Sequence, residues 1–234
     1  ARLASSRLPR KMLAEIAGKP LIWHVYNRVI QAKSLSDVLV ATDNEEIFRA
    51  VQGFGGKALM TSGNHQTGTD RIAEAAAAID ADIIVNVQGD EIGIDPDSID
   101  QLVKPMLSEH GNGIRAANLI AKISDVSDVL DITVVKVVKD LNSNILYYTR
   151  LPIPYPRVRG FTDYFRQLGV YAFRRGFLLE FARMPQSPLE LTEGIEFLRI
   201  IENGHTVHAV VSQQDSFDVD TEEDLVEARR RFSL

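Results

Sequence analysis

Short apolar runs alternate with amphipathic stretches through the first half of the chain. The apolar runs are rich in β-branched residues and predict strands at 37–41, 57–61 and 82–88. The stretches between them carry apolar residues three and four positions apart, which is typical of helices. Strands that alternate with helices in this way predict an α/β fold built on a doubly wound, mostly parallel sheet. The helices that we predict here begin at Pro20, with Leu21, Ile22, Val25 and Val29 on one face, and cover 45–51 and 71–79.

The pattern changes in the second half, after one more predicted helix near 96–109. Four apolar runs follow one another with little helix between them, which predicts a smaller antiparallel lobe or dimer surface inserted at 114–175. The predicted strands of this part are 114–123, 133–139, 144–149 and 167–173, and the chain ends with a helix at 194–201, a strand at 206–211 and a helix at 222–232. The whole chain, 1–234, is then one domain that carries an insertion.

Composition narrows the classes of protein to which the chain can belong. With 234 residues and 45% hydrophobic content, it can bury a good-sized core without disulfides or metals. There is no cysteine, which excludes thiolate catalysis and iron–sulfur clusters. A net charge of −6 argues against a nucleic-acid partner, and no apolar run has the length of a membrane span. We therefore expect a cytoplasmic protein with no nucleic-acid or membrane partner.

The acidic chain nevertheless begins with a cationic loop, ARLASSRLPRKML, which contains no acid before Glu15. Small residues leave backbone N–H groups accessible, and Arg7 and Lys11 lie four apart, so this loop can wrap a polyphosphate. The alternative is an ordinary basic surface segment. Because a loop of this kind normally follows an apolar strand, we expect roughly five to eight residues of strand before Ala1.

Carboxylates follow two of the predicted strands. Asp90 ends the run VNVQGD, and Asp218 and Asp220 lie just ahead of the last helix. Ligands bind at the carboxyl ends of strands in open α/β sheets, and one or two carboxylates with substrate phosphates are typical of a Mg²⁺ site. Turn and helix-capping roles are the alternatives, and spacing alone does not show that the two carboxylates meet.

Nine motifs in order give the chain a family resemblance. They are RLASSRLPRKML, GKPLI, VATD, HQTGTDR, VNVQGDE, VKVV, YYTRLPIPY, LGVYAFR and VDTEEDL, and they span essentially the whole sequence. Together they resemble the 3-deoxy-manno-octulosonate (Kdo) cytidylyltransferases, also called CMP-Kdo synthetases. The resemblance implies a homodimeric, Mg²⁺-dependent nucleotidyltransferase of the cytoplasm of Gram-negative-type bacteria, or of plant organelles. Such an enzyme joins CTP to an acidic eight-carbon sugar, releases pyrophosphate and serves lipopolysaccharide biosynthesis.

The resemblance also implies roles for individual residues. Asp90 and Asp220 would hold Mg²⁺, and with Lys11 and Arg7 they form the catalytic set. The residues expected around the nucleotide are Arg2, Ser5, Ser6, Thr67, Gly68, Arg71 and Gln88. Those expected on the sugar side, within or near the inserted lobe, are Arg150, Gln167, Tyr171, Glu196 and Phe197.

The sequence departs from the family pattern at several of these motifs. The usual Gly-Lys-Pro of the first loop is Arg10-Lys11-Met12, and Ile92 replaces the usual proline after Gly-Asp-Glu. On the sugar side, Gln167 and Phe197 stand where the family commonly has His and Gln. We therefore expect either weakened use of Kdo, improved by Gln167→His with Phe197→Gln, or a related sugar such as 8-amino-Kdo or a nonulosonate. A non-catalytic CTP-binding relative is the remaining alternative.

Overall fold

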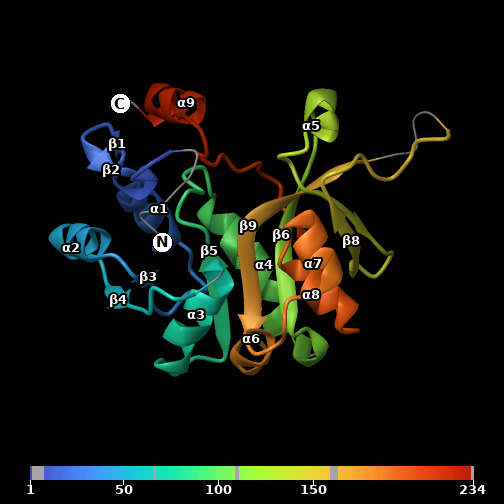
Figure 1. Ribbon diagram of the computed structural model, residues 1–234, viewed down its shortest axis with the longest axis horizontal. Coiled ribbons are helices and arrows are strands. Elements are labelled where there is room, and N and C mark those ends of the chain that lie inside the picture. The colour runs from blue at the N-terminus through green and yellow to red at the C-terminus, as the bar shows by residue number, and fades with distance from the viewer. Residues whose placement is uncertain (2–7, 66, 109–110, 159–162, 233–234) are drawn as a thin grey trace. The chain divides into compact units, whose positions relative to one another are not determined.

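The computed structural model describes residues 1, 8–65, 67–108, 111–158 and 163–232 (Figure 1). The chain divides into two compact units. The first unit comprises Ala1–Asp80, Asn86–Asp100 and Ser216–Leu234, and the second comprises Ala81–Val85 and Gln101–Asp215. The range predicted for an inserted lobe, 114–175, lies within the second unit.

The first unit carries the βα elements of the N-terminal half. Strand β3 (Val40–Thr42) pairs in parallel with β4 (Ala58–Met60), and α2 (Glu45–Gly53) connects them. The helix predicted from Pro20 is α1 (Leu21–Val29), with Pro20 as its N-cap, and its four predicted apolar residues are buried. The remaining elements of this unit are the short helix η1 (Lys11–Leu13), the hairpin β1 (Glu15–Ile16) and β2 (Lys19–Pro20), α3 (Gly68–Ala77) and α9 (Glu222–Phe232).

The second unit is built on a mixed six-stranded sheet. Its strand order is β10-β6-β9-β7-β8, and β5 (Ile83–Val87), which begins in this unit, pairs with β9. The other strands are β6 (Ala116–Lys122), β7 (Lys136–Lys139), β8 (Ile145–Thr149), β9 (Phe165–Arg174) and β10 (His208–Val211). The β6–β9, β7–β9 and β7–β8 pairs are antiparallel, which confirms the antiparallel prediction for this part, and the β10–β6 pair is parallel.

Helices lie between the strands of this sheet in the chain order (Figure 1). They are α4 (Pro96–Leu107), which begins in the first unit, η2 (Gly111–Gly113), α5 (Val126–Leu130), α6 (Arg175–Phe181), α7 (Pro188–Glu193) and α8 (Phe197–Glu202). A buried ion pair joins α7 to α8, where Arg199 Nε lies 2.7 Å from Glu190 Oε2. None of the helices in the described ranges is both long and apolar enough to cross a membrane.

The α/β class is confirmed, whereas several element boundaries differ from the sequence prediction. The strand predicted at 37–41 begins only at Val40, because the N–H of Val38 is donated to the Asp37 side chain and not to a neighbouring strand. Helices α5, α6 and α7 were not predicted, since five to seven residues are too few to show a helical period. The sheet of the second unit is mixed, as expected for a parallel sheet that carries an antiparallel insertion, and its parallel β6–β10 pair is formed by strands that are separated in the chain by α6, α7 and α8 among other elements.

Candidate active site

Three of the predicted site residues meet in the first unit. Lys11 Nζ lies 2.6 Å from Asp90 Oδ2 and 2.8 Å from Asp220 Oδ1. The lysine side chain is only 8% exposed, whereas those of Asp90 and Asp220 are 17% and 31% exposed. One ammonium group therefore joins two carboxylates that lie 130 positions apart in the sequence, and the carboxylates are more exposed than the lysine.

Close backbone approaches hold this cluster together. The two aspartate-bearing loops are hydrogen-bonded through Gly93 N to Phe217 O at 2.8 Å and through Val219 N to Asp90 O at 3.1 Å. A Cβ atom on Gly93 would lie 2.4 Å from the Phe217 nitrogen, so only glycine allows the two loops to approach this closely. A Cβ atom on Gly89 would similarly lie 2.8 Å from Met12 Sδ, next to Lys11. Gly93 is therefore required for the two loops to meet, whereas a side chain at Gly89 would only require the flexible Met12 side chain to move.

The electrostatics of Lys11 follow from this geometry. Burial by itself would lower the pKa of Lys11, but the charge of Asp90 and hydrogen bonds to Asp90 and Asp220 outweigh it, so the pKa is raised. Lys11 is therefore charged at neutral pH and neutralises part of the negative charge of the two aspartates. Asp90 and Asp220 are therefore placed so that both contact one cation, the Lys11 ammonium.

The residues of this cluster fit the predicted Mg²⁺. Two carboxylate oxygens converge on a single nitrogen at hydrogen-bonding distance, which shows that both can reach one small cation. Mg²⁺ prefers oxygen ligands and is commonly held by one or two carboxylates together with substrate phosphates and water. Within the described part of the chain, no group of three or more His, Cys, Asp or Glu side chains is placed to hold a metal.

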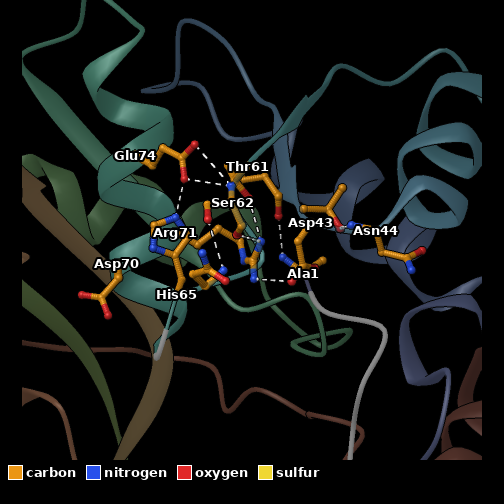
Figure 2. A network of polar contacts seen from close by, with 12 residues as sticks. Ala1, Asp43, Asn44, Thr61, Ser62, His65, Asp70, Arg71 and Glu74 are labelled. Carbon is orange, nitrogen blue, oxygen red and sulfur yellow. Dashed lines mark hydrogen bonds and ion pairs between the residues drawn. The ribbon is translucent and has the colours of Figure 1, made fainter.

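Arg71 organises a second polar network in the first unit, shown in Figure 2. Its guanidinium donates from Nη1 to Thr61 Oγ1 at 2.6 Å and to Ser62 O at 3.3 Å, and Nη2 lies 2.9 Å from Asp43 Oδ2. Arg71 is 1% exposed. Because Asp43 follows β3 and Thr61 follows β4, this buried arginine joins the ends of the two parallel strands to α3. Arg71 was predicted to lie around the nucleotide, and its buried side chain fixes the positions of Asp43, Thr61 and Ser62.

The loop between β4 and α3 is fixed at both of its ends. Glu74 accepts a hydrogen bond from Ser62 N at 3.0 Å and also contacts His65 Nε2. The hydrogen bond with His65 and then the N–H of Ser62 lower the pKa of Glu74. At the other end, Thr67 caps α3, with Thr67 Oγ1 accepting from Asp70 N at 3.1 Å. The loop is therefore pre-shaped beside the strand ends.

Of the other residues predicted around the nucleotide, two are exposed and the rest lie outside the described residues. Gly68 is the exposed first residue of α3, and Gln88 is exposed directly after β5. Arg2, Ser5, Ser6 and Arg7 lie outside the described residues. Their predicted contacts with the triphosphate of CTP stay predictions.

In the second unit, Arg150 lies just after β8 and is held by backbone groups. Its Nε donates to Glu193 O at 2.9 Å, and its Nη1 donates to Ile132 O at 2.9 Å. The Glu193 carboxylate accepts from Arg150 N at 3.1 Å and from Thr149 Oγ1 at 2.7 Å. The orientation of the Arg150 guanidinium is therefore fixed.

The other predicted sugar-side residues separate into core and surface positions. Phe197 is 2% exposed. The centroid of its ring lies 4.4 Å from the ring centroid of Tyr171, 5.6 Å from that of Phe173 and 5.9 Å from that of Tyr148. Gln167 is half-buried on β9, and Glu196 is half-buried at the N-cap of α8. The Phe197 ring is therefore part of an aromatic core, which bears on the sequence prediction that it alters sugar choice.

The structure also places polar residues that the sequence analysis did not select. Asp43 pairs with Arg71, and Lys136 is fully buried on β7. Asn118, also fully buried, donates to Leu168 O and Val170 O at 3.1 Å and bridges an irregularity between β6 and β9. Lys136 and Asn118 are single polar residues inside apolar runs, VVKVV and AANLIA, and this isolation was the available signal.

An α/β fold in which a lysine meets one carboxylate that follows a strand and a second that precedes a helix is suited to binding the phosphates of a nucleotide, and the comparison with known families agrees. The family model described as Cytidylyltransferase matches residues 1–212. The 3-deoxy-manno-octulosonate cytidylyltransferase of Geobacter metallireducens is 46% identical, over 100% of this chain and 97% of the relative. The enzyme of the same name from Geobacter sulfurreducens is 45% identical, over 96% of this chain and 94% of the relative.

A solved structure supports the same assignment. It is described as CMP:2-keto-3-deoxy-manno-octonic acid synthetase complexed with CTP, and it matches with a TM-score of 0.93 and 38% sequence identity. The match covers 99% of this chain and 95% of that one. The chain therefore belongs to the 3-deoxy-manno-octulosonate cytidylyltransferase family, which confirms the resemblance inferred from the nine motifs.

Proposed function

We propose that this protein transfers a cytidylyl group from CTP to 3-deoxy-D-manno-octulosonate, giving CMP-Kdo and pyrophosphate. The observation that carries the proposal is the Lys11–Asp90–Asp220 cluster, found in a chain of this family. In the reaction, the anomeric hydroxyl of the sugar attacks the α-phosphorus of CTP, and the bond to the β-phosphate breaks. Both reactants are anionic, so the protein's task is to hold them in line and to balance charge.

The residues of the first unit suit this task. The Lys11 ammonium is held between Asp90 and Asp220, where it can neutralise the charge that develops on the leaving pyrophosphate. Arg71 joins Asp43 to Thr61 and Ser62, so the polar residues that follow β3 and β4 are held together beside α3, where they can contact the nucleotide. No side-chain nucleophile is required, because the sugar hydroxyl itself attacks.

We further propose that the enzyme depends on Mg²⁺ held by Asp90 and Asp220. The bound ion would polarise the phosphate oxygens and lower the pKa of the attacking hydroxyl. Support for this assignment comes from the two carboxylates that already share one cation. Titration of turnover with Mg²⁺, in enzyme first treated with EDTA, tests the dependence.

We also propose a cytoplasmic homodimer that supplies lipopolysaccharide synthesis. Large apolar side chains are exposed along β8 and the segment that follows it, namely Leu146, Leu151, Tyr155 and Val158. Exposed apolar groups concentrated on one stretch of chain are typical of a subunit interface. Light scattering during gel filtration measures the oligomeric state, and Leu146→Glu should shift it toward the monomer.

The decisive experiment measures pyrophosphate release from CTP with a panel of acidic sugars. Kdo should be used best, UTP or ATP should not replace CTP efficiently, and Asp220→Asn should abolish most turnover. Preference for 8-amino-Kdo or a nonulosonate would change the substrate but keep the reaction. Binding of CTP without turnover on any acidic sugar would contradict the proposed enzyme.

A further inference from the structure

Lys136 is a buried cation for which the proposed reaction has so far given no role. It lies on β7 with no exposed surface. Its ammonium donates to two backbone carbonyls, Asp131 O at 2.6 Å and Val134 O at 2.7 Å. A lysine costs free energy when it is buried, and two neutral carbonyls compensate that cost only in part. A leucine would fill such a core position without this cost, so the charge calls for an explanation.

Arg150 binds the same short segment as Lys136. While Lys136 binds the carbonyls of Asp131 and Val134, Arg150 Nη1 donates to Ile132 O at 2.9 Å and lies 3.4 Å from Thr133 O. All four carbonyls of residues 131–134 are thus directed at two cations from neighbouring strands. The segment that orients the Arg150 guanidinium is itself held in place by Lys136.

Strand register places Lys136 next to the segments that carry two of the predicted sugar-side residues, Arg150 and Gln167. On one side it lies opposite Thr149 of β8, which precedes Arg150. On the other it lies opposite Arg166 of β9, which precedes Gln167, and Gln167 N donates to Val135 O at 2.9 Å. Lys136 therefore lies between the two strands that lead to Arg150 and Gln167.

Two cations, Lys136 and Arg150, lie near two carboxylates, Asp131 and Glu193. Burial lowers the pKa of Lys136, the neighbouring Asp131 opposes this shift, and the charge of Arg150 adds to it. The nearby Glu193 carboxylate is engaged by Thr149 Oγ1 and Arg150 N. Lys136 and Arg150, which repel each other, are thus kept together by two carboxylates and by the carbonyls of residues 131–134.

We propose that Lys136 is a positioning residue for the acidic sugar: it holds residues 131–134 so that their carbonyls aim the Arg150 guanidinium at the sugar carboxylate. The proposal rests on the proposed function, because it concerns the acidic substrate of that reaction. Lys136 acts through Arg150 and does not itself touch the sugar. Its effect should therefore fall on the sugar and not on CTP.

The primary test compares Lys136→Met with a matched change on the same strand, Lys139→Met. Lys139 is half-buried beside the Phe165 ring and binds none of the carbonyls of residues 131–134. In Lys136→Met the KM for Kdo should rise at least tenfold while the KM for CTP stays within twofold, and Lys139→Met should change neither. A purely structural role would lower the melting temperature and kcat without separating the two KM values, and that result would overturn the proposal.

A double-mutant cycle tests whether Lys136 acts through Arg150. Once Arg150→Met has removed the guanidinium, adding Lys136→Met should change the KM for Kdo less than threefold. If the two effects multiply fully, Lys136 does not act through Arg150, and the proposal fails. If Lys136→Met does not fold, Lys136→Gln keeps one donor for the carbonyls and takes its place in the cycle. Arg150→Met alone must also raise the KM for Kdo, and an unchanged value would overturn the proposal without any Lys136 variant.

The proposed function is tested separately by the wild-type protein. If wild type fails to turn over Kdo, the proposed function fails, and calorimetric binding of Kdo to wild type and Lys136→Met then replaces KM. Binding weakened at least tenfold in the variant would support the positioning role, and equal binding, or none to either protein, would overturn it.

Discussion

Lys11 Nζ lies 2.6 Å from Asp90 Oδ2, so the lysine predicted to face the triphosphate is bonded to a predicted magnesium ligand. The same ammonium also reaches Asp220. The positive charge of Lys11 therefore neutralises part of the negative charge of Asp90 and Asp220. The variants of these residues should separate their roles in metal binding, catalysis and stability.

Asp90→Asn should leave the fold intact and lower turnover by at least about 100-fold. The amide keeps an oxygen that can accept from Lys11, but it is a weak ligand for Mg²⁺ and carries no charge to balance the ion. Pyrophosphate release measured across a Mg²⁺ titration checks this, with Asp80→Asn, an exposed carboxylate of the same unit, as control. Near-normal rates at ordinary Mg²⁺ concentrations would remove Asp90 from the metal site.

Lys11→Met should lower kcat more than it raises the KM for CTP, because the ammonium matters most as pyrophosphate leaves. It should also reduce the free energy of unfolding by about 1–3 kcal/mol in EDTA, since two neighbouring carboxylates lose their shared cation. Added Mg²⁺ should recover more stability in the variant than in wild type. A loss confined to the KM for CTP would reduce Lys11 to a binding residue.

The raised pKa of Lys11 fixes how its stabilising effect depends on pH. A group whose pKa is higher in the folded protein contributes stability that is fully present below its unfolded value, here 10.5, and is lost as the pH rises through the folded value. The stability difference between wild type and Lys11→Met should therefore stay constant between about pH 6 and 9. Urea unfolding at several pH values measures this difference, and a steep change within that window would contradict the assignment.

Asp43→Ala should reduce the free energy of unfolding by about 2 kcal/mol, because a buried guanidinium loses its charged partner. It should also weaken CTP binding, since Arg71 then holds the loop before α3 less firmly. Asp37→Ala removes an exposed ion pair with Lys57 and serves as the control, with little expected change. Unfolding curves and CTP calorimetry measure the two effects. Equal results for the two variants would show that the Arg71–Asp43 pair contributes neither to stability nor to CTP binding.

Elements with strong local signals could be predicted from the sequence. Helix α9 was predicted at its observed bounds because an acidic first turn and a basic last turn mark both of its ends. Asp90 and Asp220 were selected because strand ends collect ligands in α/β sheets. Their contact with Lys11 could not be predicted, because it depends on loop approaches at Gly89 and Gly93 that join distant parts of the chain. Lys136 was missed for a similar reason, since its partners become visible only once the register of β7 is known.

Arg10 has a φ of 59°, in the left-handed region that favours glycine. It stands where the family commonly has glycine, and its only recorded partner in the described residues is Glu46, in an exposed ion pair. Both Arg10→Gly and Arg10→Ala remove that pair, so the comparison isolates the backbone. Arg10→Gly should be more stable than Arg10→Ala by about 1 kcal/mol, measured by urea unfolding. Equal stabilities would show that this backbone conformation costs nothing.

Phe197→Gln should lower the free energy of unfolding by about 3 kcal/mol or more. The phenyl ring is almost fully buried against Tyr171, Tyr148 and Phe173, so an amide there loses aromatic contacts and places polar atoms among apolar ones. Phe197→Leu, which keeps the position apolar, should cost less than about 1.5 kcal/mol and controls for the loss of volume.

This expectation changes the outcome foreseen for the double replacement of Gln167 and Phe197. Gln167→His alone leaves the aromatic core untouched and can add a charge-assisted hydrogen bond to an acidic sugar, so this single change should account for any gain in kcat/KM for Kdo. The added Phe197→Gln should then reduce stability without a further gain. Unfolding curves and steady-state kinetics of the two single variants and the double variant measure this. If Phe197→Gln keeps wild-type stability and raises kcat/KM for Kdo, the ring belongs to the sugar site and is not required in the core.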